Sequence, residues 1–172
     1  MQATANTIDT VVSDQQGSRE GKYLTFALGG EEYGIGILKV KEIIGLMSIT
    51  PVPKTPTHMR GVINLRGKVI PVVDLRVKFG MERGESTDRT CIVVVEIASD
   101  NGKIFIGIVV DSVSEVLNIR AAEIEDTPGF GSKLDTAYIL GMAKSGQGLK
   151  ILLDIDKVLV RSEIVGADDQ VF

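Results

Sequence analysis

Two stretches of the chain have the pattern of β-strands, the first through alternation of apolar and other residues and the second through a run of β-branched residues. The first comprises residues 23–28 and 33–37, separated by a Gly-Gly turn. The second comprises a β-branched run over 91–97 and a return strand over 104–110, separated by an Asp-Asn-Gly turn. Because Gly, Asn and Asp tolerate positive φ, both patterns predict β-hairpins.

The segments that follow the two hairpins also resemble each other. Residues 61–75, which end in Val-Val-Asp-Leu, are echoed by residues 141–155, which end in Leu-Leu-Asp-Ile, at a constant offset of 80. Directly after each hairpin, a constant offset of 73 residues aligns Val40, Glu42 and Ile43 with Val113, Glu115 and Val116. Two matched blocks in the same order indicate an internal duplication.

The duplication sets the expected domain organisation. Each copy is too short to bury much surface alone, and its short strands are separated by Gly and Pro turns, so we expect an all-β fold of two small, mutually packed barrels. The expected segments are a flexible leader at 1–20, a first barrel half at 21–82, a linker at 83–89, a second barrel half at 90–160, and a short helix and tail at 161–172.

Helix is scarce in this pattern. One short helix is expected over 38–46, where it would carry Val40 and Glu42, and another over 156–165, where Gly166 would stop it. Gly36 stands where a capping residue such as Asp is expected ahead of the first helix, and Gly is an acceptable although weaker N-cap.

Composition narrows the classes of function. With 44% hydrophobic residues, 24% charged residues and a net charge of −4, the chain is typical of a globular protein without the basic clusters that nucleic-acid binding requires. Charged residues interrupt every apolar run before it reaches the ~18 residues of a membrane span, and no signal peptide is recognisable. Cys91 is the single cysteine, so no disulfide forms within the chain. A cytoplasmic location is expected.

No catalytic constellation is recognisable. One His and one Cys exclude a metal site of His and Cys pairs, and His58 lies in a polar loop without a partnering nucleophile pattern. Residues 141–148 only superficially resemble a phosphate loop, because Gln147 replaces the required Lys, and a hairpin is expected there instead. Asp74 and Asp154 occupy equivalent positions, where each is expected to end a strand by accepting backbone hydrogen bonds. We therefore expect no enzyme activity, no cofactor and no metal.

Several ordered motifs resemble one family. The stretch over 26–35 with 40–43, the run Met-Arg-Gly-Val-Ile-Asn-Leu-Arg-Gly-Lys-Val-Ile-Pro-Val-Val-Asp-Leu-Arg over 59–76, and the segments 106–116 and 138–141 are similar to the CheW family of chemotaxis coupling proteins. The resemblance covers roughly residues 22–160. It implies two intertwined SH3-like barrels, a hydrophobic groove that receives a chemoreceptor hairpin tip, contact with the regulatory domain of the kinase CheA, and recruitment to membrane-associated arrays that include further copies.

Carried over by position, the family's receptor and kinase contacts fall on Val40, Glu42, Gly61 and Arg66 in the first copy, on Val113 and Val116 in the second, and on Phe130. Phe130 resembles the aromatic residue through which ring-like arrays form, or it anchors its own glycine-flanked loop. On burial habits alone, a plain core role is the favoured alternative for each of the three valines.

Arg66 is the sharpest candidate. The turn over 65–68 is expected to project Arg66 outward while Leu65 and Val69 point inward, and Glu42 is expected to hold the guanidinium in position.

The alternatives to a coupling protein are a coupling domain of a larger protein, such as CheV or CheA itself, a barrel that binds single-stranded nucleic acid, and a small hydrolase. Only 5% of residues are aromatic, which disfavours nucleic-acid stacking, and no reactive cluster supports a hydrolase.

Overall fold

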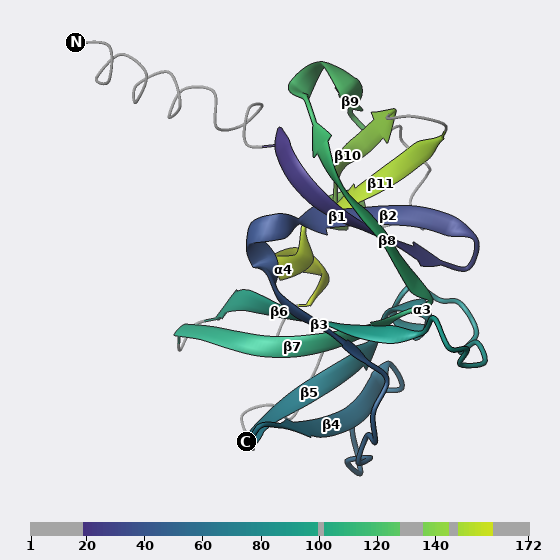
Figure 1. The fold of residues 1–172 in the computed structure, drawn as a ribbon, viewed down its shortest axis with the longest axis vertical. Coiled ribbons are helices and arrows are strands. Elements are labelled where there is room, and N and C mark those ends of the chain that lie inside the picture. Colours follow the sequence, from purple (N-terminus) through teal and green to yellow (C-terminus); the bar gives the residue numbers. More distant parts are fainter. Residues whose placement is uncertain (1–18, 100–101, 128–135, 145–147, 160–172) are drawn as a thin grey trace.

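Two β-sheets make up most of the described chain, with helical turns of three or four residues between strands (Figure 1). The computed structural model describes residues 19–99, 102–127, 136–144 and 148–159. The all-β fold and both sequence-predicted hairpins are confirmed. The expected leader and the expected tail lie outside the described residues, apart from the last residues of the leader.

The first sheet has six strands, and its order places strands of both sequence copies side by side. In spatial order these are β8 (Ser112–Ile119), β1 (Gly21–Leu28), β2 (Glu31–Gly36), β11 (Leu149–Leu153), β10 (Ile139–Lys144) and β9 (Ile124–Glu125). All neighbours are antiparallel except β2 and β11, which are parallel. The hairpin expected in place of a phosphate loop is therefore present as β10 and β11.

The second sheet has five strands and the same mixed origin. In spatial order these are β3 (Val40–Gly45), β6 (Cys91–Ser99), β7 (Gly102–Val110), β5 (Lys68–Asp74) and β4 (Met59–Leu65). Only β5 and β7 are parallel. Each sheet thus combines one hairpin from one copy with the later strands of the other copy, so the barrels are intertwined (Figure 1).

The two helix predictions need correction. The helix expected over 38–46 is wrong, because only a 3-10 turn, η1 (Ile37–Lys39), forms before strand β3 begins. Val40, Ile43 and Ile44 are β-branched residues that suit a pleated edge, and β3 pairs along β6. The second helix, α4 (Ile155–Val158), begins one residue earlier than expected, and the remainder of its predicted range from 160 lies outside the described residues.

The short helices are capped at equivalent positions. Asp74 precedes α3 (Leu75–Lys78) and accepts a hydrogen bond from the Val77 N–H at 3.3 Å. Asp154 precedes α4 and accepts one from the Lys157 N–H, also at 3.3 Å. The predicted structural role of both carboxylates is therefore confirmed. Two further 3-10 turns, η2 (Ala121–Glu123) and η3 (Thr136–Tyr138), connect the later strands.

The largest core cluster lies between the sheets and draws residues from both. Phe26 and Ile35 enter it from the six-stranded sheet, and Val95 and Ile106 enter it from the five-stranded sheet. All four side chains are completely buried. Since neither sheet could bury this cluster alone, burial of apolar surface between them holds the two barrels together.

Candidate functional site

Arg66 lies in a two-residue hairpin turn between β4 and β5. Arg66 and Gly67 both have positive φ, +52° and +86°, which is the type I′ geometry that matches the twist of paired strands. The Asn64 side chain accepts a hydrogen bond from the Gly67 N–H at 2.8 Å and fixes the turn. The turn therefore presents Arg66 to solvent, with 69% of its side chain exposed.

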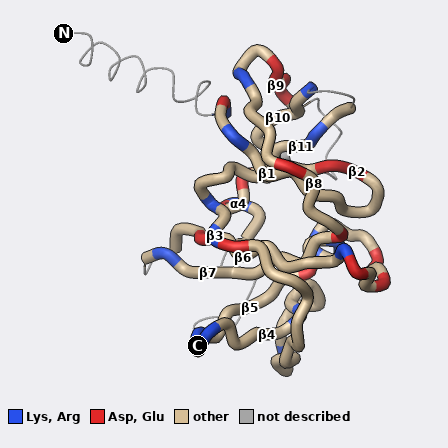
Figure 2. The backbone as a smooth tube through the Cα atoms, viewed as in Figure 1, with Lys and Arg blue, Asp and Glu red and all other residues tan. Residues whose placement is uncertain are grey.

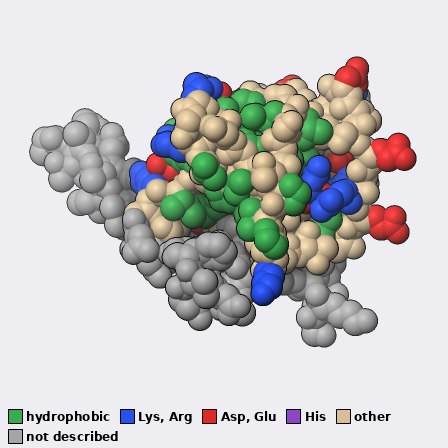
Figure 3. Space-filling view, turned by 90° about the horizontal axis from the view of Figure 1, so that it is seen from below, with side chains coloured by type: hydrophobic (Ala, Val, Ile, Leu, Met, Phe, Trp, Pro, Cys, Tyr) green, Lys and Arg blue, Asp and Glu red, His purple; other side chains and the backbone are tan. Residues whose placement is uncertain are grey.

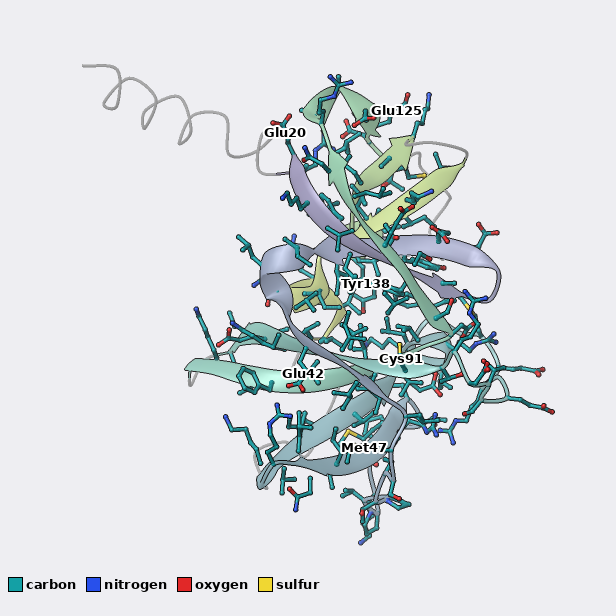
Figure 4. All side chains as sticks on the ribbon, in the orientation of Figure 1. Glu20, Glu42, Met47, Cys91, Glu125 and Tyr138 are labelled. Carbon is teal, nitrogen blue, oxygen red and sulfur yellow. The ribbon has the colours of Figure 1, made fainter. Side chains whose placement is uncertain are left out.

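Glu42 on β3 holds the Arg66 guanidinium in a bidentate ion pair, the Arg66–Glu42 clasp. Arg66 Nη1 donates to Glu42 Oε2 at 3.1 Å, and Nη2 donates to Oε1. The hydrogen bond from Arg66 lowers the pKa of Glu42, so the pair stays charged at neutral pH. The predicted tether is confirmed, although Glu42 reaches Arg66 from a strand rather than from a helix (Figure 4).

Val69 does not point inward as the sequence predicted. Its side chain is 65% exposed. The hairpin register explains the difference, because Ile63 lies opposite Ile70 and both are buried, which turns the neighbouring Asn64 and Val69 pair to the outer face. Val69 is therefore an exposed apolar side chain three residues after Arg66.

The edge strands β3 and β8 also expose apolar residues. Ile43 is 46% exposed and Val116 is 49% exposed, and the two are equivalent in the duplication. Val40 and Val113, the other equivalent pair, are half-buried and pack on the large core cluster. Burial thus favours a partly structural role for Val40 and Val113, whereas the exposure of Val116 contradicts the core interpretation.

The two edge strands meet at Cys91. Cys91 lies opposite Gly45, the last residue of β3, and its thiol is hydrogen-bonded to the backbone of Val113 near the start of β8. Burial raises the pKa of the Cys91 thiol, so it stays protonated and packs as a small apolar side chain. Figure 4 shows Cys91 where β8 reaches the five-stranded sheet. The edge strands therefore flank the junction between the barrels.

Gly61 is a buried residue of β4. A Cβ built at Gly61 would lie 2.1 Å from the Thr50 carbonyl oxygen, and its φ is +142°. Thr50 and Val62 exchange hydrogen bonds of 2.8 and 2.9 Å, which attach the loop between β3 and β4 to β4. Close backbone approach thus explains the glycine. Phe130 lies outside the described residues.

Duplication and exposure together identify residues that sequence reasoning missed. Val69 and Leu149 are equivalent at the offset of 80 and are both exposed, as Ile43 and Val116 are at the offset of 73. The offsets were readable from sequence, but the outward orientation of each side chain was not. Figure 3, which views the molecule from the end formed by β4 and β5, shows apolar side chains gathered at its centre with charged side chains around them.

Catalytic and metal-binding groups do not gather in the described part of the chain. No three His, Cys, Asp or Glu side chains there are placed to hold a metal ion. Burial lowers the pKa of His58, which favours its neutral form. Basic and acidic residues are interspersed over both barrels (Figure 2). Among the described helices, none is long and apolar enough to cross a membrane.

The described residues thus form a duplicated pair of intertwined β-barrels that expose apolar side chains at equivalent positions. Comparison with protein-family models gives the particular family. The model for CheW-like domains matches residues 22–163, and the chain belongs to this family.

Individual relatives agree with this assignment. The chain is 43% identical to the chemotaxis protein CheW of Klebsiella aerogenes over 159 residues, which cover 92% of this chain and 93% of that protein. It is 33% identical to CheW of Bacillus subtilis over 138 residues, which cover 80% and 86% respectively. The crystal structure of the scaffolding protein TtCheW from Thermoanaerobacter tengcongensis matches with a TM-score of 0.73 and 35% identity, covering 86% of this chain and 97% of that one.

Proposed function

We propose that this protein is a chemotaxis adaptor that couples the cytoplasmic tips of chemoreceptors to the histidine kinase CheA. The observation that carries the proposal is the duplication of exposed apolar positions, Ile43 with Val116 on the edge strands and Val69 with Leu149 at the barrel ends. A protein that joins two partners needs separate surfaces, and these two kinds of position supply them. Membership of a family of chemotaxis scaffolds supports the same function.

The receptor surface lies along the edge strands in this proposal. Val40, Val113 and Val116, together with Ile43, offer apolar side chains on either side of the junction at Cys91. A receptor hairpin would place an apolar stripe with i, i+3, i+4 and i+7 spacing against them, as a helix in a groove.

The kinase surface lies at the Arg66–Glu42 clasp. The guanidinium is exposed and held in position, and Val69, three residues later in the chain, supplies exposed apolar area. Gly61, on the same strand that leads to the Arg66 turn, lets the β3–β4 loop approach β4. Phe130 is proposed to contact neighbouring molecules in receptor arrays.

The mechanism is effective concentration rather than chemistry. Each interface needs only an ordinary size, with ~800 Å² buried per partner, and a modest affinity. Repeated receptor and kinase contacts reinforce one another in an array. The protein would act in the cytoplasm, without cofactor, recruited to membrane-associated receptors.

Co-sedimentation tests the proposal directly. Receptor-containing membranes should pellet the protein, should pellet the kinase only when the protein is present, and should raise autophosphorylation of the kinase only when all three are combined. Phosphotransfer or ATP hydrolysis by the purified protein alone, or sedimentation of the kinase regardless of the protein, would refute it.

A further inference from the structure

In the described residues the chain crosses between the two sheets twice, from β2 to β3 and from β7 to β8. Asp111 lies at the β7–β8 crossing and binds Arg76 of α3 through both carboxylate oxygens, at 2.8 and 2.7 Å. Its Oδ2 also accepts a hydrogen bond of 2.9 Å from the Gly29 N–H, at the turn of the β1–β2 hairpin. These three residues, here called the Arg76 joint, connect α3, which follows β5, to a hairpin of the six-stranded sheet.

An ion pair also lies at the β2–β3 crossing. Lys39 of η1 binds Asp156 of α4, with 2.6 Å between Nζ and Oδ2. Oδ1 of Asp156 accepts a hydrogen bond of 3.0 Å from the Ala98 N–H of β6. These three residues, the Lys39 joint, connect α4, which follows β11, to a hairpin of the five-stranded sheet. In Figure 1, α4 lies to the left and α3 to the right along the boundary between the sheets.

The two joints are equivalent in the duplication, but their charges are exchanged. Arg76 and Asp156 correspond at the offset of 80, and Lys39 lies one residue beyond the position that corresponds to Asp111 at the offset of 73. The helix therefore carries the cation in one joint and the carboxylate in the other. The two backbone donors match as well, because each follows a residue pair that is equivalent in the registers of the two hairpins. A contact that both copies keep with opposite charges indicates a requirement of this place in the fold.

The joints add direction to the packing of the sheets. The core between the sheets is apolar, and burial of apolar surface has no preferred direction. Two bodies connected at two points retain one rotation, about the line through those points. Each joint binds the opposite sheet beside one of the two crossings, and a bidentate arginine–carboxylate pair has a fixed geometry. The joints therefore oppose a rotation that the apolar core permits.

Such a rotation would affect the two proposed binding surfaces differently. The apolar residues of the proposed receptor surface come from β3 in one sheet and from β8 in the other. Each of these strands begins directly after a crossing that carries a joint. The Arg66–Glu42 clasp, in contrast, lies within the five-stranded sheet alone. The angle between the sheets thus changes the receptor surface and leaves the clasp as it is.

We propose that the two joints position the receptor surface by fixing the angle between the sheets. Arg76 and Asp111 hold the start of β8, and Lys39 and Asp156 hold the start of β3, so the joints together set the distance between the edge strands. The inference rests on the proposed function for the ligand of that surface. The Arg76 joint has the larger effect, because its arginine makes two fixed contacts where a lysine makes one flexible contact.

Residual dipolar couplings of the ¹⁵N-labelled full chain test the angle without receptor or kinase. In the parent protein, the alignment frames fitted separately to the amides of the two sheets should coincide. Arg76→Asp places two carboxylates together, so the two frames should separate. If this variant does not fold, Arg76→Gln, which removes the cation without adding a like charge, is measured in its place. Lys39→Gln should separate the frames by a smaller angle.

A charge exchange at the Arg76 joint provides the rescue. Arg76→Asp with Asp111→Lys gives this joint the side chains of the other joint, so the two frames should coincide again. The equivalent helix α4 already carries Asp154 as its cap and Asp156 two residues later, which shows that a short helix here accommodates both carboxylates. Lys144→Gln removes an ion pair of 2.5 Å between β10 and β9, inside one sheet. It is the control and should leave the frames coincident.

Receptor binding is the second measurement. Arg76→Asp should weaken binding of a receptor-tip fragment about tenfold, which is in the usual range of coupling between sites. Binding of the kinase regulatory domain should stay unchanged, and the charge-exchanged double variant should recover receptor binding. A parent protein that binds no receptor fragment would refute the proposed function, whereas the dipolar couplings decide on the joints by themselves.

Four results would overturn the proposal. The first is coincident frames in both Arg76→Asp and Lys39→Gln. The second is frames that stay separated in the charge-exchanged variant. The third is separated frames with unchanged receptor affinity, because the angle would then not matter for binding. The fourth is an equal loss of receptor and kinase binding, because the joints would then serve only the stability of the fold.

Discussion

At the scale of single residues, a substitution of Arg66 should affect partner binding without affecting folding. Because its side chain is mostly exposed, Arg66→Glu should change the melting temperature little. At an interface, reversing the charge of a central arginine commonly lowers affinity more than tenfold. We therefore expect kinase activation by receptor to collapse in a folded protein.

Thermal unfolding and a pull-down with receptor fragment and kinase check this prediction together. The double variant Arg66→Glu with Glu42→Arg restores the ion pair with its members exchanged and serves as the control. Arg66 would be misassigned if the single variant bound normally, or if it lost binding only because it had unfolded.

Gly61 should behave in the opposite way. Gly61→Ala places a Cβ against the Thr50 carbonyl at a positive φ, which we expect to cost about 2 kcal/mol of unfolding free energy. For a chain of this size that corresponds to a melting temperature lower by about 4–8 °C. Gly45→Ala, where a Cβ would meet open space, should change it far less. Equal melting temperatures for the two variants, measured by calorimetry, would contradict the packing explanation of Gly61.

At the scale of elements, turns and alternation were enough to predict the hairpins, whereas side-chain orientation was not. The Gly-rich turns fixed the two hairpins because positive φ is a local requirement. The mixed apolar spacing of Val40–Gly45 fits either a helix or a strand, and only its pairing with β6 decides for the strand. The orientation of Val69 follows from the register between β4 and β5, which a local sequence pattern does not show.

In the candidate site, too, some features could be predicted from the sequence and others depend on the fold. The pairing of Glu42 with Arg66 was predictable, because opposite charges in one copy needed only to be close. Ile43 was missed although the duplication aligned it with Val116, since its exposure depends on β3 lying at a sheet edge. The exchange of hairpins between copies could not be read from local pattern at all.

The edge strands provide the prediction at this scale. Ile43→Lys and Val116→Lys put a charge into the proposed apolar groove, so each should weaken receptor binding while stability changes little, because both side chains are already about half exposed. Asn118→Lys, exposed on the same strand as Val116, is the control.

The same apolar groove predicts how receptor binding depends on salt. Binding of a receptor fragment by the parent protein should persist at ~1 M salt, where the Debye length is ~3 Å. Release of the fragment by salt would show that charge dominates instead.

At the scale of the whole molecule, one carboxylate links the two sheets. Asp111 follows β7 and binds Arg76 of α3 through both oxygens, at 2.8 and 2.7 Å, and its Oδ2 also accepts the Gly29 N–H at 2.9 Å. Gly29 belongs to the turn of the β1–β2 hairpin, in the other sheet. The hydrogen bonds from Arg76 hold the pKa of Asp111 below its usual value.

This joint predicts a pH dependence. A carboxylate whose pKa is lower in the folded state contributes stability above its unfolded pKa of about 3.9 and loses it as the pH falls through the folded pKa. Between pH 7 and pH 3 the urea midpoint of the parent should therefore fall more steeply than that of Asp111→Asn, which lacks the titrating group. Parallel pH profiles for the two proteins would contradict a stabilising role for this joint.

The exchange of hairpins between the barrels has a consequence for synthesis on the ribosome. Strand β3 has no neighbour until β6 has emerged, and β2, which pairs with β1, gains its second neighbour only with β11, more than a hundred residues later. The nascent chain can therefore complete neither barrel from its first copy alone, and a truncated translation product presents unpaired strand edges rather than half an adaptor. Under the proposed function, the Arg66–Glu42 clasp needs β3 paired with β6, and the receptor surface needs β8, so neither surface can form before the second copy has been made.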